Sequence, residues 1–194
     1  EQFHNLISFS TQKSNGQRYN SSTEDIRAYY QGAYQVNKSN SLDWSAGYIA
    51  NEFGANGYYA APGDKESYEL VKTFLAHFST KHYIGDKFYI SPRVSNRYNT
   101  DDYRYFRNDL SKARSEHKNN ALSFELNSRL TTNIGDFGLG LELRDEDIKS
   151  TNLGNHDREN FGSYLEYRTT LLPKITLHLG AYSNYNSQYG WELF

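Results

Sequence analysis

A chain of 194 residues with no cysteine and a net charge of −2 excludes several classes of protein. Without cysteine there is no disulfide framework, no thiolate nucleophile and no cysteine-based zinc site. The mean hydropathy is −0.86 and no apolar run approaches the ~20 residues of a transmembrane helix, while the weak acidic charge offers no basic surface for nucleic acid. The 18 tyrosines and 11 phenylalanines make the chain too aromatic for a disordered segment.

Alternating apolar and polar side chains predict β-strands in the first half of the chain. In the segment 42–52, for example, Leu42 and Trp44 face one way, whereas Asp43 and Ser45 face the other. Five such strands are predicted, near 4–12, 24–36, 42–52, 68–82 and 87–97. Pro92 cannot donate to a strand ladder, so a bulge or local irregularity is expected there.

The second half predicts four clearer strands, which makes nine in all. Their alternating apolar positions begin with Leu122, Phe124, Leu126 and Leu130, followed by Phe137, Leu139, Leu141 and Leu143, by Phe161, Leu165, Tyr167 and Leu171, and by Ile175, Leu177, Leu179 and Ala181. These strands span about 10–14 residues, close to the ~9–11 that a tilted membrane strand needs and longer than the ~5–6 of globular strands. We expect Leu122, Phe124, Leu126, Leu139, Leu141, Leu177 and Leu179 to face lipid, and Glu125, Arg129, Glu142, Glu166 and Arg168 to face a lumen.

Short and long connections alternate strictly along the chain. The short ones are Asn37–Ser41, Tyr83–Asp86, Asn133–Asp136 and Leu172–Lys174; the long ones are 13–23, 53–67, 98–119 and 145–159. Short periplasmic turns and long outer loops give this rhythm in an antiparallel up-and-down transmembrane β-barrel of the Gram-negative outer membrane. An odd count, with the first and last strands both running toward the long-loop side, predicts that residues 1–194 are one partial barrel domain of a larger barrel. A soluble β-sheet binding module is the alternative fold.

One segment resembles a known family. It runs Tyr48-Ile49-Ala50-Asn51-Glu52-Phe53-Gly54-Ala55-Asn56-Gly57-Tyr58-Tyr59, followed by Pro62 and Tyr68-Glu69. The run is similar to the strand and outer loop of vitamin B12-type TonB-dependent receptors, in which it ends Phe-Tyr rather than Tyr-Tyr. The hairpin Asn119–Arg144 also looks like the mid-barrel of these receptors.

The resemblance implies a receptor of about 22 strands with a plug domain, which is not present in this sequence. Its function would be uptake of a bulky scarce nutrient, cobalamin or another corrinoid first and a ferric siderophore second. The implied partners are this small-molecule substrate, membrane lipid, the TonB complex through missing parts of the chain, and a surface lipoprotein. The ligand is expected to contact Phe53, Asn56, Tyr58, Tyr59, Tyr103, Tyr105 and Arg107, which combine rigid aromatic rings with polar groups.

Nothing in the sequence predicts an enzyme or a resident cofactor. The acidic runs 145–147 and 101–102 offer oxygen ligands that could hold Ca²⁺ in the outer loops, although charge runs usually only solvate a rim. His77 and His82 lie five residues apart and should face opposite sides of a strand, so they should not share a metal. A rival hypothesis is an outer-membrane phospholipase or protease, which would need a Ser/His/Asp set converging on one wall.

Overall fold

A computed structural model describes residues 2–57 and 65–193, and these residues form one antiparallel β-sheet. No helix among them is long and apolar enough to cross a membrane. The ten strands are β1 (Phe3–Ser14), β2 (Thr23–Asn37), β3 (Asn40–Gly54), β4 (Tyr68–Ile84), β5 (Phe88–Arg104), β6 (Arg114–Thr132), β7 (Gly135–Ser150), β8 (Gly154–Leu172), β9 (Ile175–Asn186) and β10 (Gly190–Leu193).

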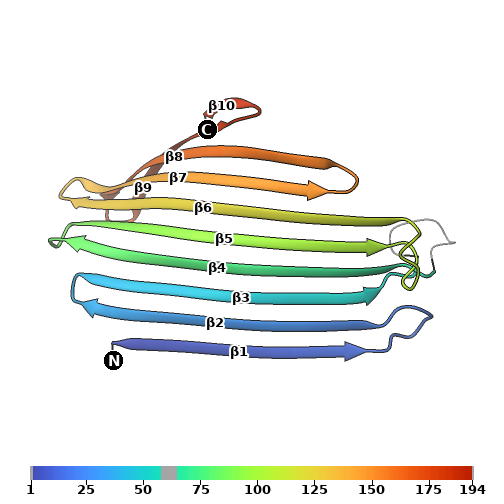
Figure 1. The fold of residues 1–194 in the computed structure, drawn as a ribbon. Helices are drawn as coiled ribbons and strands as arrows, with labels where there is room; N and C mark the ends of the chain where they lie inside the picture. The colour runs from blue at the N-terminus through green and yellow to red at the C-terminus, as the bar shows by residue number, and fades with distance from the viewer. Residues whose placement is uncertain (1, 58–64, 194) are drawn as a thin grey trace.

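Each strand pairs with the next one along the chain, in the order β1 to β10 (Figure 1). The predicted all-β, up-and-down architecture is therefore confirmed. The predicted count of nine strands is wrong by one, because residues beyond the ninth predicted strand form the short strand β10. Its Trp191 packs on Tyr185 and Phe161, with ring centroids 5.2 Å and 6.3 Å away. Among the described residues, β1 and β10 are not paired with each other, so the sheet is open, as expected of a partial barrel.

The two ends of the sheet carry different connections. The turns that join β2 to β3, β4 to β5, β6 to β7 and β8 to β9 lie together at one end, and the remaining connections lie at the other end (Figure 1). This end separation confirms the predicted topology. We call the second end the loop rim.

Two of the predicted long loops are wrong in length. The connection predicted at 145–159 is only the turn 151–153, and the one predicted at 98–119 is 105–113. The ladder continues through the charged segments, with Asp147 opposite Asp157 and Lys118 opposite Lys149. At these residues the alternation of apolar and polar side chains stops, but the backbone pairing continues. The strands are therefore longer than the sequence pattern predicts.

Pro92 interrupts the ladder without a bulge. Ser79 pairs with Arg93 and His82 with Ile90, so the register of β4 on β5 is the same on both sides of the gap. The hydroxyl of Ser91 donates to the carbonyl oxygen of Thr80 over 2.9 Å, beside the proline that lacks an N–H. The expected irregularity is therefore confined to missing hydrogen bonds.

The register separates the side chains into two faces. Leu126 lies opposite Leu141, and the neighbouring positions Glu125 and Glu142 lie opposite each other on the other side. All the residues predicted to face lipid share the first face, which we call the outer face, and all those predicted to face a lumen share the second, the inner face. His77 lies on the inner face and His82 on the outer face, as predicted.

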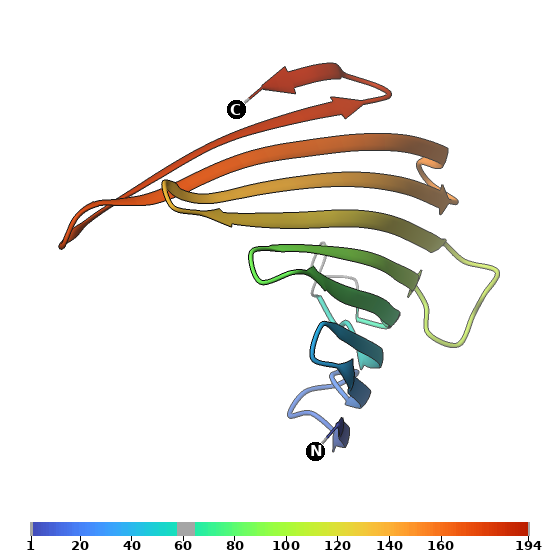
Figure 2. The same ribbon diagram turned by 90° about the vertical axis from the view of Figure 1, so that its left-hand side faces the viewer.

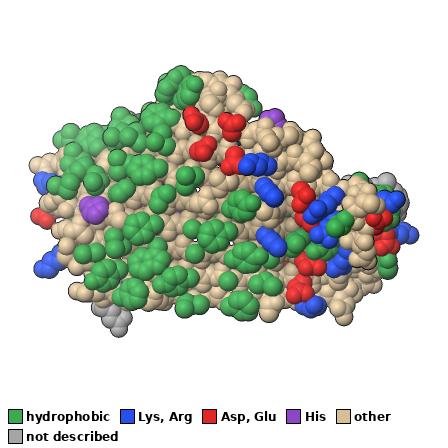
Figure 3. Space-filling model, in the orientation of Figure 1, with side chains coloured by type: hydrophobic (Ala, Val, Ile, Leu, Met, Phe, Trp, Pro, Cys, Tyr) green, Lys and Arg blue, Asp and Glu red, His purple; other side chains and the backbone are tan. Residues whose placement is uncertain are grey.

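The outer face is apolar and exposed. Phe9, Phe124, Leu139 and Leu165 keep 69%, 46%, 48% and 58% of their surface accessible. Figure 3 shows apolar side chains over most of the sheet, with charged groups gathered toward the loop rim. Among the described residues, only Ala55 and Tyr68 are buried apolar side chains, so the sheet has no hydrophobic core of the globular kind. Its curvature (Figure 2) therefore does not serve to wrap one.

Candidate functional site: the polar inner face

The inner face is hollowed by a groove of about 580 Å³. Side chains from six consecutive strands, β2 to β7, line it, which requires this face to be concave. Its floor is a row of paired residues across the sheet, Ser45, His77, Ser95, Ser123 and Arg144. The serine side chains are small, so they leave space above the sheet between the longer side chains that surround them.

Three arginines line this groove. Arg93 and Arg97 lie on β5, on either side of the serine row, and Arg144 ends the row on β7. None of the three guanidinium groups donates a hydrogen bond to a described residue. Arg93 Nη1 is 3.8 Å from Glu125, Arg144 Nη1 is 3.7 Å from Glu142, and these separations exceed a hydrogen bond. Arg144 Nε is also 3.6 Å from Glu146, so the ion pairs of Arg93 and Arg144 are loose ones that lie beyond hydrogen-bond distance.

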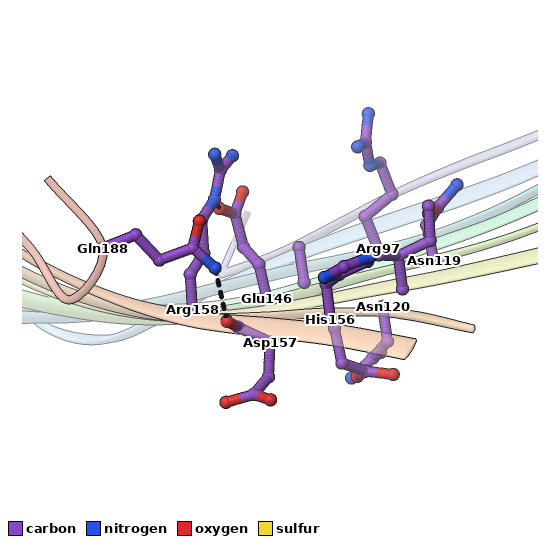
Figure 4. A pocket seen from close by; sticks show the side chains of 11 residues that line it. Arg97, Asn119, Asn120, Glu146, His156, Asp157, Arg158 and Gln188 are labelled. Carbon is purple, nitrogen blue, oxygen red and sulfur yellow. Dashed lines mark hydrogen bonds and ion pairs between the residues drawn. The ribbon is translucent and has the colours of Figure 1, made fainter. Parts of the chain in front are cut away.

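A second hollow of about 360 Å³ adjoins the groove toward the loop rim and shares Arg97 and Glu146 with it (Figure 4). Here Arg158 binds Glu146 directly, and Asn160 donates to the same carboxylate over 3.2 Å. Figure 4 shows Arg97, Arg158 and Glu146 on one side of the sheet and the Asp157 carboxylate on the other. Gln188, from the β9–β10 turn, donates to the Asp157 carbonyl oxygen over 3.0 Å and so closes the end of this hollow.

The inner face also holds a hydrogen-bonded set of Asp43, Ser45, His77 and Ser79. Ser45 Oγ lies 2.8 Å from His77 Nδ1, His77 Nε2 lies 3.1 Å from Asp43, and Ser79 donates to Asp43 over 2.5 Å. The Ser/His/Asp set named for the enzyme hypothesis thus does converge on one wall. However, Ser45 sits mid-strand and pairs on both sides, so its backbone N–H is used by the sheet and cannot serve as an oxyanion donor.

Toward the short-turn end, the inner face is filled rather than hollow. The ring of Tyr164 lies over Gly140, where an added Cβ would come within 1.9 Å of it. The Tyr164 hydroxyl donates to Asn127 over 2.9 Å. The absence of a side chain at Gly140 therefore leaves the space on the inner face that this tyrosine fills.

The residues predicted to bind a ligand lie at the loop rim, where Phe53 and Tyr103 share one row of the ladder through Glu69. Phe53 and Tyr103 are the penultimate residues of β3 and β5, and Asn56 donates to the Tyr19 carbonyl oxygen over 2.5 Å. Tyr105 stacks edge-on against Phe106 at 5.0 Å. Tyr58 and Tyr59 lie outside the described residues. As a binding site this set stays a prediction, since the structure contains no ligand.

Arg107 anchors the rim internally. Its Nη2 donates to Glu52 over 3.1 Å, its guanidinium lies 4.8 Å from the ring centroid of Tyr68, and its backbone N–H donates to Glu66. In the same cluster, the Tyr19 hydroxyl donates to Glu66 over 2.6 Å, and this hydrogen bond raises the pKa of Tyr19. Arg107 therefore ties the loops to one another.

The acidic runs do not converge. Glu146 is on the inner face, whereas its neighbours Asp145 and Asp147 are on the outer face. Asp102 lies on the outer face, where its carboxylate oxygens are each 2.7 Å from a guanidinium nitrogen, one of Arg104 and one of Arg114. Asp101 lies on the inner face. In the described part of the chain, no three His, Cys, Asp or Glu side chains are grouped to hold a metal ion. Calcium in the outer loops stays a prediction.

Comparison with known proteins gives a likeness of fold and no match of sequence. No family model matches the chain, and no curated protein matches it. Among solved structures, the chain is similar to the translocator domain of the autotransporter NalP from Neisseria meningitidis, with 10% identity and a TM-score of 0.49, covering 100% of this chain and 72% of that one.

This finding contradicts the TonB-dependent-receptor interpretation. The solved structure is an autotransporter translocator domain and not an uptake receptor, and no family or sequence match supports the B12-receptor resemblance. The predicted uptake of cobalamin, or of a ferric siderophore in its place, is withdrawn with it. The ten antiparallel up-and-down strands, apolar outside and polar inside, have the architecture of an outer-membrane β-barrel wall.

The inner arginines are the residues that sequence reasoning missed. Their signal was present, because Arg93 and Arg97 share the parity of Ser91, Ser95 and Asn99 along β5. What the sequence does not contain is the curvature that brings Arg144, from two strands away, to the same groove.

Proposed function

We propose that this chain forms part of the wall of an outer-membrane β-barrel whose inner face lines a water-filled passage for hydrophilic solutes. One observation carries the proposal: large apolar side chains cover the outer face and remain exposed, while the opposite face is polar and charged. Lipid on one side and water on the other satisfy both faces, whereas the described strands alone leave the apolar face in contact with water.

The apolar band has the dimension of a membrane. On β5 it runs from Phe88 to Tyr98, and on β8 from Phe161 to Leu171. Ten residues rise about 34 Å along a strand, which becomes about 26 Å across the membrane at a tilt of about 40°. Outer-membrane barrels carry an apolar band of about 25 Å between two aromatic girdles. Aromatic residues also lie near both ends of the apolar band of this sheet. On the short-turn side, the ring centroids of Phe137 and Tyr167 are 4.9 Å apart.

The proposed role is passive. The polar set around His77 orders the inner face by satisfying its own hydrogen bonds, and we assign it no catalytic step because Ser45 lacks a free oxyanion donor beside it. Secretion of a passenger is not part of the proposal, because the likeness to the autotransporter domain is one of fold at low identity.

The test is reconstitution of the full-length protein that contains this chain. It should fractionate with the outer membrane, migrate faster on electrophoresis before heating than after it, and conduct ions in a planar lipid bilayer. A protein that stays in aqueous solution without detergent, or a folded membrane protein that never conducts, would contradict the proposal.

A further inference from the structure

The groove on the inner face concentrates positive charge. Arg93, Arg97 and Arg144 line it, and Glu146 is the one carboxylate among its described lining residues. The wider inner face is not cationic, since Glu125, Glu142 and Glu166 also lie on it. The local excess therefore belongs to the groove.

The arginines of the groove differ from those elsewhere in the sheet. Arg104, Arg114 and Arg129 each donate to a carboxylate at 2.7 Å or less. By contrast, Arg144 Nε is buried with no hydrogen-bond partner, its separation from Glu146 being 3.6 Å, and Arg97 forms no ion pair with a described residue. The Arg144 side chain as a whole is 38% exposed, so the outer nitrogens of its guanidinium remain accessible to an anion in the groove.

The geometry suits an oxyanion. Arg93, Arg144 and Arg97 occupy three successive rows of the ladder, and the hydroxyls of Ser95 and Ser123 lie in the middle row. A guanidinium presents a planar fork of donors that matches a carboxylate or phosphate, and serine hydroxyls can complete its coordination. The groove of about 580 Å³ has room for a small hydrophilic molecule.

From these observations we infer that the groove is a selectivity site for small solutes that carry phosphate or carboxylate groups. This inference rests on the proposed passage and names the class of solute that the passage favours. Rings of Arg or Lys select for anions in pores by the same electrostatics.

The experiment measures ion selectivity of the full-length protein in a planar bilayer under a KCl gradient, at low salt. The wild type should prefer chloride to potassium, and inorganic phosphate should reduce the chloride current. At about 7 Å from a permeating anion in water, each guanidinium raises the local anion concentration about 2.7-fold. Arg97→Gln with Arg144→Gln should therefore lower the chloride preference about sevenfold. Arg114→Gln is the matched control, since its guanidinium is on the outer face.

A second pair of variants separates charge from geometry. Arg97→Lys with Arg144→Lys keeps both charges, so the chloride preference should survive while the block by phosphate weakens through loss of the forked contacts. These variants also cover the case in which the glutamine pair does not fold.

The outcomes distinguish the two proposals. A protein that never conducts overturns the passage itself. A conducting wild type with no anion preference and no phosphate block overturns the anion site alone. Equal changes of selectivity in the glutamine pair and in the Arg114→Gln control would also overturn the anion site.

Discussion

Arginine in place of Leu165 tests which face of the sheet meets lipid. Leu165 lies near the middle of the apolar band on β8, cross-strand from Leu139 and Ala181, and keeps 58% of its surface exposed. Arginine at the midplane of a membrane barrel costs about 2–4 kcal/mol and near the interface about 0–1 kcal/mol. We therefore expect Leu165→Arg to lower the free energy of unfolding by about 2–4 kcal/mol.

Two controls carry the same new side chain. Glu166→Arg sits on the next residue and faces the inner side, where water can solvate it, so it should change stability by less than about 1 kcal/mol. Leu143→Arg stands at the edge of the band beside Asp145 and should cost about 0–1 kcal/mol. The assay is reversible urea unfolding of the full-length protein in lipid vesicles. Equal losses at Leu165 and Glu166 would refute the assignment of the two faces.

Two further predictions concern topology and packing. Cysteine introduced at Ser111 or Asn152, both at the loop rim, should react with an impermeant maleimide on intact cells, whereas cysteine at Lys38 in a short turn should not; equal labelling would refute the arrangement. Gly140→Ala should destabilise the fold by about 1–3 kcal/mol because its Cβ meets the Tyr164 ring, and Tyr164→Ala in the same chain should relieve most of that loss in urea unfolding. Additive effects of the two substitutions would show that the ring does not cover the glycine.

The strands and their faces could be predicted from the sequence because the two faces of the sheet differ in polarity. Apolar and polar residues therefore alternate along each strand. Period-two alternation at Leu122, Phe124 and Leu126 fixes both the strand and the side, and the observed register keeps all three on one face. Pairing of neighbours followed from the short turns, because two or three residues allow nothing but an antiparallel return. The fold class thus follows from local information.

The ends of the strands could not be read in the same way. Above the apolar band both faces meet water, so alternation disappears although the ladder continues, as at Asp147 and Lys149. Strand β10 was missed for the related reason that four residues are too few to display a period. Backbone hydrogen bonds leave no mark in the side-chain pattern once the environment is uniform.

The groove on the inner face could not be predicted from the sequence. Alternation places Arg93 and Arg97 on the inner face, but the distance between β5 and β7 across it depends on how strongly the sheet curves. The family resemblance pointed instead to the rim, where Arg107 is engaged by Glu52 and Tyr68. An aromatic, arginine-rich loop has the same composition whether it binds a ligand or packs on its neighbours.

The charged upper part of β7 and β8 bears on how the sheet would sit in the membrane as part of the proposed barrel. Asp145 faces Glu159 and Asp147 faces Asp157 on the outer face, and like charges directly opposite each other are destabilising unless water separates them. These rows must therefore stand in water, which puts the bilayer boundary between Leu143 and Asp145. The short turns at the other end follow the apolar band within a few residues, since Leu171 is two positions from Pro173. The sheet consequently projects from the membrane on the loop side only, which is the asymmetry expected when that side is the cell exterior.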